Sequence, residues 1–131
     1  MRILDCGMRD KDREARGKGN LRTDTVFRKE KEMAFMQIVI SPKVPEGSGI
    51  SPYVAEIHKY LKTTQFPHQL HDMGTIVEGK AGELLALARK LHEIPFKKGV
   101  KRVYTTIQID DRRDKKVSLG DKVKSVRKKL R

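Results

Sequence analysis

The segment QLHDMGTIVEGKAGELLALARKLHEI, residues 69–94, places two short β-type runs, a glycine turn and a long helical pattern in direct succession. The runs on either side of Met73-Gly74 predict a hairpin, because glycine adopts the backbone conformations that a tight turn requires. One face of the helical pattern carries aliphatic residues at helical spacing, namely Leu84, Leu87, Ala88 and Leu91. Pro95 is expected to close this helix, since proline lacks the backbone N–H that a helix interior uses.

The sequence before this segment predicts one strand and one helix. Residues 34–42, AFMQIVISP, are apolar and β-branched, which is typical of a strand that ends at its proline. Residues 51–62, SPYVAEIHKYLK, predict a helix with Ser51 as the N-cap and Pro52 at the first helical position. Its apolar residues recur at helical spacing and form one buried stripe.

The sequence after the segment predicts a strand and a further helix. In VKRVYTTIQID, residues 100–110, β-branched residues alternate with others, which indicates a strand with its β-branched face buried. In SLGDKVKSVRKKL, residues 118–130, Ser118 and Asp121 have a spacing similar to a capping box. An apolar stripe follows, so this helix is expected to lie across a partner surface.

The predicted order is therefore β-α-β-β-α-β-α, which is an α+β, ferredoxin-like βαββαβ sandwich with an extra C-terminal helix. Both long helices should cover one face of a four-stranded antiparallel sheet. The other face then stays bare unless the C-terminal helix, a second sheet or a ligand covers it.

The length of 131 residues predicts one ordinary domain with one core. Residues 1–34 are expected to form a disordered or loosely ordered N-terminal extension, since they have no sustained periodicity, and residues 35–131 should form the domain. The codons AAG-GAG for Lys31-Glu32 would create a bacterial ribosome-binding sequence before Met36. We therefore hypothesise that translation starts at Met36 or, with less support, at Met33.

A net charge of +13 favours anionic partners. The aromatic residues are scattered rather than interleaved with basic ones, so a platform that stacks nucleic-acid bases is disfavoured. The single cysteine, Cys6, excludes an intramolecular disulfide and fits a reducing compartment. No apolar run has the length of a membrane span or of a secretory signal, so we expect a cytoplasmic protein without a membrane partner.

Residues that carry chemistry are sparse. The four histidines are dispersed, so we expect no metal site. Asp110 and Asp111 are adjacent at a strand end and should point in opposite directions, so we expect no catalytic residue there and no enzyme. Glu78-Gly79-Lys80 precedes a helix, and free N–H groups at that position would hold an anion or a polar ligand edge.

Two segments taken together resemble a known family. HDMGTIVEGKAGELLAL, residues 71–87, and GVKRVYTTIQIDDRRDKKVSLGDKVKSV, residues 99–126, resemble the motifs of the thiamine-binding, YkoF-like family of small ferredoxin-like proteins, formerly an uncharacterised protein family. The resemblance covers residues 35–126. The loop SPKVPEGSGIS, residues 41–51, departs from the family pattern by being longer and more polar.

The resemblance implies a protein that binds thiamine or its hydroxymethylpyrimidine part without catalysis and without a cofactor, for vitamin B1 transport, salvage or sensing. It also implies a homodimer or homotetramer that forms through sheet faces. The hairpin motif corresponds to Met73, Gly74, Thr75 and Glu78. The terminal motif corresponds to Thr105, Thr106, Asp110, Asp111, Arg112 and Arg113. The start of the first helix corresponds to Ser51, Tyr53 and Val54.

One physical conflict accompanies this expectation. Thiamine carries a positive thiazolium, and the positive field of the chain opposes the capture of a cation. A local carboxylate such as Glu78, a phosphorylated ligand, or binding of the neutral pyrimidine alone would each resolve the conflict. The rival hypothesis is a nucleic-acid-binding module, and its contacts would come from the basic C-terminal helix, through Lys122, Lys124, Arg127, Lys128, Lys129 and Arg131.

Overall fold

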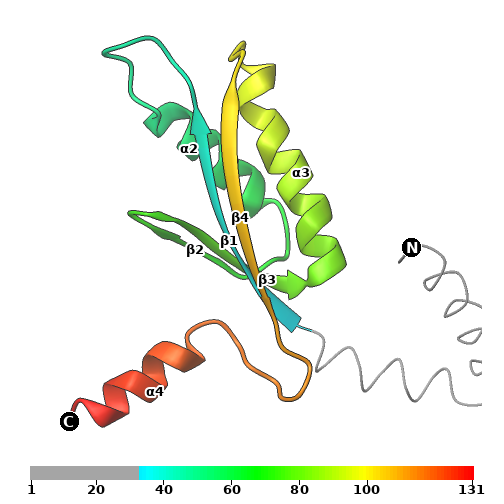
Figure 1. Ribbon diagram of the computed structural model, residues 1–131, viewed down its shortest axis with the longest axis vertical. Coiled ribbons are helices and arrows are strands. Elements are labelled where there is room, and N and C mark those ends of the chain that lie inside the picture. Colours follow the sequence, from blue (N-terminus) through cyan, green and yellow to red (C-terminus); the bar gives the residue numbers. More distant parts are fainter. Residues whose placement is uncertain (1–32) are drawn as a thin grey trace, which may run out of the picture.

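The structure is a computed structural model that describes residues 33–131 (Figure 1). Its elements, in chain order, are β1 (Met33–Pro42), α2 (Ser51–Lys62), β2 (His68–His71), β3 (Gly74–Lys80), α3 (Ala81–Lys97), β4 (Val103–Asp111) and α4 (Asp121–Lys129). The predicted βαββαβ order and the additional C-terminal helix are both confirmed.

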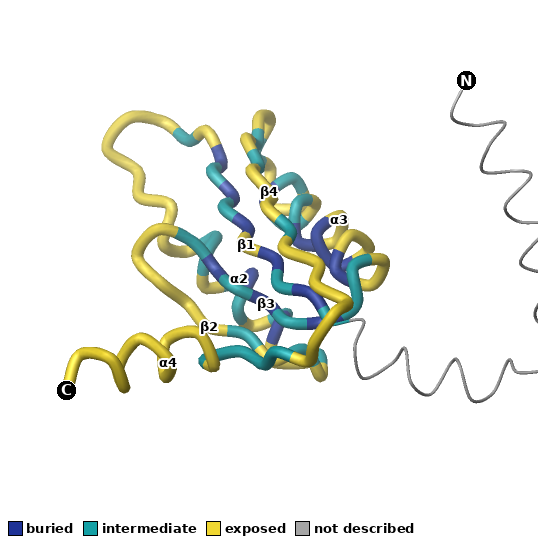
Figure 2. Tube along the Cα trace, turned by 60° about the horizontal axis from the view of Figure 1, so that its bottom comes forward, coloured by how far each residue is buried: buried dark blue, intermediate teal, exposed yellow. Residues whose placement is uncertain are grey.

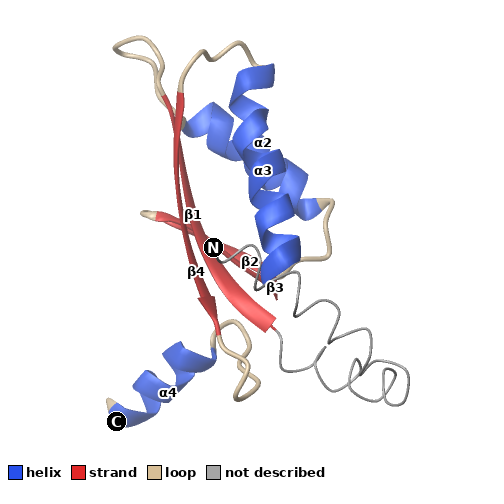
Figure 3. Ribbon diagram, turned by 45° about the vertical axis from the view of Figure 1, so that its right-hand side comes forward, coloured by secondary structure: helices blue, strands red, loops and turns tan. Residues whose placement is uncertain are grey.

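The four strands form one antiparallel sheet in the order β2-β3-β1-β4. This order is that of a ferredoxin-like fold, because β1 and β3 lie in the centre and each half of the chain contributes one edge strand. Figure 3 shows α2 and α3 together on one side of the sheet. The described residues leave most of the other side without a helix, and we call this side the open face.

Alternation along β1 places every second side chain toward α2 and α3. The buried core consists of Ala34, Met36, Ile38 and Ile40 from β1, Ile57 and Leu61 from α2, Val77 from β3, and Leu84, Leu87, Ala88 and Leu91 from α3. The predicted helical stripe of α3 is thus confirmed. Full burial of one large aliphatic side chain contributes roughly 1.5–3 kcal/mol, so this single layer provides the main stabilisation of the fold.

Two helix boundaries differ from the prediction. Ser51 is the first residue of α2 and not its N-cap, because the carbonyl of Ile50 accepts the first helical hydrogen bonds, from Tyr53 and Val54. The helix α3 continues through Pro95 and ends at Lys97. Pro95 is buried in the core and removes only one N–H donor in the last turn, so packing maintains the helix there.

The C-terminal helix α4 begins at Asp121, after Gly120 in the left-handed conformation at φ +97°. The predicted pairing forms in part, since Asp121 Oδ2 accepts a hydrogen bond from the Ser118 N–H at 2.8 Å. The helix does not lie on its own sheet, and all its residues are exposed within the described part of the chain (Figure 2).

The predicted N-terminal extension lies outside the described residues, except for Met33 and Ala34, which are already paired in β1. Within residues 33–131, no helix is both long enough and apolar enough to cross a membrane.

Candidate functional site

A hollow of about 440 Å³ lies on the open face. Its floor comes from all four strands, and one wall comes from residues 117–123, which are the end of the loop before α4 and the first residues of α4. The lining residues are Phe35, Gln37, Gln69, His71, Ile76, Gln108, Ile109, Asp110, Ser118, Leu119, Gly120, Lys122 and Val123. We call this hollow the sheet-face pocket and residues 117–123 the strap. Its volume is within the range that small-molecule sites occupy.

The middle of the pocket floor is one continuous row across the sheet. The strand register aligns Gln69 with Ile76, Ile76 with Gln37, and Gln37 with Gln108. All four side chains point to the open face, because side chains at paired positions project from the same side of a sheet. Three of the four glutamines in the chain therefore meet in one pocket. Each offers an amide carbonyl acceptor and an NH₂ donor.

Two carboxylates in the next row of the sheet, those of Glu78 and Asp110, fix the strap to the sheet. Glu78 Oε1 accepts a hydrogen bond from the Leu119 N–H at 2.5 Å. Lys122 Nζ donates to Asp110 Oδ2 at 2.7 Å, and its ammonium also lies 5.5 Å from the centre of the Phe35 ring. Residues 117–120 are half-buried, whereas residues 111–116 and α4 are exposed. Residues 117–120 of the strap are therefore the part of the C-terminal segment that packs on the sheet.

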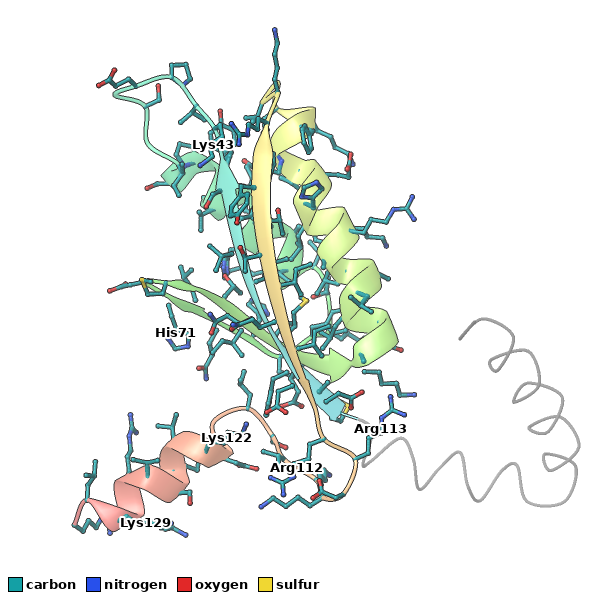
Figure 4. The ribbon with its side chains drawn as sticks, in the orientation of Figure 1. Lys43, His71, Arg112, Arg113, Lys122 and Lys129 are labelled. Carbon is teal, nitrogen blue, oxygen red and sulfur yellow. The ribbon has the colours of Figure 1, made fainter. Side chains whose placement is uncertain are left out.

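These contacts also set the charge of the pocket. The carboxylate of Asp110 is neutralised by Lys122, and that of Glu78 is occupied by a backbone donor. Figure 4 shows Lys122 where the strap meets the sheet, and His71 projecting from β2 on the side of α4. The pocket thus combines apolar side chains with neutral amides, and both nearby carboxylates are already hydrogen-bonded.

Thr75 and Thr105, two predicted ligand residues, face the helices and not the open face. His58 Nε2 lies 2.9 Å from Thr75 Oγ1, and His92 Nδ1 lies 2.8 Å from Thr105 Oγ1. Burial lowers the pKa of His58, and electrostatic interactions with His68 and Lys62 lower it further. Each hydroxyl thus forms a hydrogen bond between a helix and the sheet.

Other predicted residues lie at separate hollows. Met73, Gly74 and Thr75 line one of about 290 Å³ between α2 and the β2–β3 hairpin. Tyr53 lines another of about 380 Å³ beside the loop after β1, and Ser51 is exposed at the start of α2. The structure does not bring these residues together with the sheet-face pocket.

Of the terminal motif, Asp110 lines the sheet-face pocket, and Thr106 lies on the open face one row above the glutamines. Arg112 donates to both oxygens of Asp114, at 2.6 and 3.0 Å, and this hydrogen bonding lowers the pKa of Asp114 and raises that of Arg112. Arg113 pairs with Asp111 at 2.9 Å. Figure 4 shows both arginines on the exposed loop after β4, beyond the end of the sheet.

Asp110 and Asp111 point to opposite faces and have different partners, as the alternation of a strand predicts. Among residues 33–131, no three His, Cys, Asp or Glu side chains are close enough to hold a metal ion together.

The glutamine row was missed in the sequence because its members are ordinary polar residues in three different strands. Strand alternation would have placed Gln37 and Gln108 on the open face. Their alignment with Gln69 depends on the register of all four strands, and a hairpin motif alone does not specify that register.

The chain is similar to a family model and to known proteins. A family model described as "Thiamine-binding protein" matches residues 36–127. The UPF0045 protein YqgV of Bacillus subtilis is 43% identical over 102 residues, which is 75% of this chain and 98% of that protein. A UPF0045 protein of Methanothermobacter thermautotrophicus is 35% identical over 99 residues, 75% of this chain and all of that protein.

Solved structures agree with the fold. Protein MJ1052 of Methanocaldococcus jannaschii aligns with a TM-score of 0.64 and 26% identity, over 72% of this chain and 96% of that one. A Thermotoga maritima protein, described as a candidate thiamine biosynthesis/salvage protein, aligns with a TM-score of 0.61 and 17% identity, over 72% of this chain and 98% of that one.

Proposed function

Because the chain belongs to the thiamine-binding protein family, we propose that its sheet-face pocket binds thiamine or the hydroxymethylpyrimidine part of thiamine and catalyses no reaction. The observation that carries this proposal is the row of Gln69, Gln37 and Gln108 across the pocket floor. An aminopyrimidine has an amino donor beside ring-nitrogen acceptors, and amide side chains complement both. Phe35, Ile76 and Leu119 supply apolar contacts for the ring.

The pyrimidine is the part that this pocket is suited to hold. Both carboxylates near the pocket are engaged, Glu78 by a backbone N–H and Asp110 by Lys122. Neither carboxylate is therefore free to pair with a thiazolium cation, whereas the row of amides suits the neutral pyrimidine. We expect hydroxymethylpyrimidine to bind at least as tightly as thiamine, and the thiazole part alone not to bind.

The same family membership leads us to propose an assembly and a cellular role. The open face that holds the pocket is also the surface through which a homodimer or homotetramer would form, and we propose such an assembly. Roles in vitamin B1 transport, salvage or sensing in the cytoplasm are compatible with a binder that releases its ligand unchanged.

Calorimetric titration tests the binding site. We expect saturable heat with hydroxymethylpyrimidine and with thiamine. Gln37→Ala and Gln108→Ala should each weaken binding by about tenfold or more, because a lost hydrogen bond in such a site costs roughly 1–3 kcal/mol. Gln65→Ala is the matched control, since Gln65 is the one glutamine outside the pocket and is exposed in the loop after α2.

Two results would contradict the proposal. One is the absence of heat with both hydroxymethylpyrimidine and thiamine at millimolar concentration. The other is equal affinity of Gln37→Ala, Gln108→Ala and Gln65→Ala. Mass spectrometry of the recovered ligand checks the absence of catalysis, and any covalent change that depends on the protein would contradict it.

A further inference from the structure

The central strand β1 extends further than its neighbour β3. It pairs with β4 as far as Pro42, but its pairing with β3 ends at Ile38, opposite Thr75. Figure 1 shows β1 and β4 continuing past the β2–β3 hairpin. Residues 39–42 of β1 therefore present a free strand edge on the side that β3 occupies further down the sheet.

The hydrogen-bond register shows which backbone groups lie along this free edge. The Lys43 N–H donates to the Arg102 carbonyl at 2.8 Å, so these two residues form a hydrogen-bonded pair at the end of the β1–β4 ladder. In an antiparallel ladder such pairs alternate with pairs that exchange no hydrogen bond. Ile40, opposite Thr105, lies three positions from Lys43 and is therefore of the second kind. Its N–H and C=O point away from β4, toward the free edge.

These two backbone groups of Ile40 have no hydrogen-bond partner among residues 33–131. The residue is nevertheless only 7% exposed. Pro42, the next residue on the same side of β1, has no N–H, so Ile40 supplies the N–H donor of the free edge. Buried backbone N–H and C=O groups are nearly always paired in folded proteins. An unpaired donor and acceptor on one buried residue therefore indicate a place where a ligand binds.

The free edge borders the hollow of about 290 Å³ between α2 and the β2–β3 hairpin, which we call the edge hollow. Its lining shares only His71 with that of the sheet-face pocket. Leu70 and Met73 at the hairpin are 58% and 82% exposed, so the hollow has an apolar rim. Its volume is near the lower end of the range for small-molecule sites, which suits a ligand of one or two rings. From β1 and α2 it is lined by Ile38, Val39, Ile40, Ile50, Val54 and Ile57.

The backbone groups of Ile40 determine which ring fits. The N–H requires an acceptor and the C=O requires a donor, and both groups lie on the same side of the strand. A ligand must therefore carry an acceptor and a donor on neighbouring atoms. A peptide strand would gain only one such pair of hydrogen bonds, because Pro42 follows on the free edge.

We propose that the edge hollow is a second binding site, which takes a small planar ring of the cyclic-amide type. The ring carbonyl accepts a hydrogen bond from the Ile40 N–H, and the ring N–H donates to the Ile40 C=O. The aliphatic side chains of α2 and β1 pack against the ring. This inference does not rest on the proposed function, because it involves a different hollow and different groups.

Hydrogen exchange of the ligand-free full chain tests the premise. By the alternation of the ladder, Ile38 and Thr75 form a hydrogen-bonded pair, whereas the Ile40 N–H has no acceptor in the described chain. The Ile40 amide should exchange about tenfold faster than the Ile38 amide, or more. Equal protection of the two amides would show that Ile40 already has an acceptor, and would overturn the inference.

A ¹⁵N NMR titration of the full chain with 2-pyridone tests binding. N-methyl-2-pyridone is the matched control, since a methyl group replaces its N–H donor. The Ile40 amide signal should shift with saturation at millimolar 2-pyridone. The N-methyl compound should bind about tenfold more weakly, or worse, because it cannot donate to the Ile40 C=O.

Two variants of α2 test the location of the site. Val54→Phe adds a ring at the wall of the edge hollow, and Ala55→Phe adds the same ring at an exposed neighbour that does not line it. Val54→Phe should raise the dissociation constant for 2-pyridone by about tenfold or more, and Ala55→Phe should leave it nearly unchanged. Unchanged amide signals in β4 check that both variants keep the fold.

Each outcome has a defined meaning. No shift of the Ile40 amide at millimolar 2-pyridone, equal affinity for the two pyridones, or equal effects of the two variants would overturn the second site. Hydroxymethylpyrimidine also carries a neighbouring donor and acceptor, so its titration is read at the Ile40 amide and at the glutamine NH₂ signals. A shift at Ile40 without any shift of the glutamines would contradict the proposed function and support the second site.

Discussion

Glu78 lies at the row next to the glutamines, and its hydrogen bond to the Leu119 N–H connects β3 to the strap. The family resemblance predicts that Glu78 contacts the ligand. In the structure its carboxylate instead holds one wall of the pocket, so we interpret Glu78 as a positioning residue. A hydrogen bond to a charged group contributes about 1.5–3 kcal/mol, which is enough to keep the strap closed for most of the time.

Glu78→Ala should therefore release the strap. We expect hydrogen exchange at the Leu119 amide to accelerate by about tenfold or more, because its acceptor is lost. Glu78→Gln keeps a carbonyl acceptor and should have a smaller effect. NMR exchange rates of the ligand-free protein measure both. An unchanged rate at Leu119 in Glu78→Ala would show that the strap is held by other contacts.

Thr75 and Thr105 show the limit of transferring a motif by position. The sequence identifies them as strand residues, which is correct, but the strand face depends on which side the helices cover. Their hydroxyls lie within hydrogen-bonding distance of His58 and His92. A motif match therefore contains residues that maintain the fold together with residues that line the pocket, and only the register separates them.

At the scale of elements, local patterns were sufficient to predict each helix and strand. Apolar spacing predicts α3, and alternation predicts which side each residue of β4 faces. The β-branched side of β4 is only partly buried, because Ile107 remains 41% exposed. The start of α2 and the end of α3 were harder to predict. Both depend on the folded chain, through the carbonyl of Ile50 at the start of α2 and the packing of Pro95 in the core. The position of α4 away from its sheet was likewise not encoded in its amphipathic pattern.

The β2–β3 hairpin provides a prediction at this scale. Gly74 has φ +151°, and a Cβ there would lie 2.9 Å from Val39 Cγ2 and 3.2 Å from the Ile38 carbonyl oxygen. Gly74→Ala should lower the free energy of unfolding by about 1–3 kcal/mol, through strain and this contact. Urea denaturation measures the loss.

Gly82→Ala is the matched control for the same substitution. Gly82 lies in the first turn of α3, and a Cβ there would meet no atom within 4 Å. Alanine has the higher helix propensity, so this variant should be as stable as the unmodified chain or more stable. Equal destabilisation by both substitutions would contradict a special role of Gly74 in the hairpin.

For the whole molecule, the composition indicated an anionic partner. The pocket in the structure, however, is lined mainly by apolar side chains and neutral amides. The net charge of +13 includes the basic residues of α4 and of the loop after β4, which lie outside the pocket apart from Lys122. Net charge describes the long-range field, whereas ligand choice depends on the few groups within hydrogen-bonding distance. The sequence predicted the fold and the family, but not the pocket that the register assembles.

The side-chain amide signals of the glutamines test the central claim most directly. The chain contains four glutamines and one asparagine, so a ¹⁵N NMR spectrum has few such signals to assign. On addition of hydroxymethylpyrimidine, the NH₂ signals of Gln37, Gln69 and Gln108 should shift together with saturation, and that of Gln65 should not. Shifts confined to residues around Tyr53 or Met73, or no shifts at all at millimolar ligand, would contradict a binding site on the glutamine row.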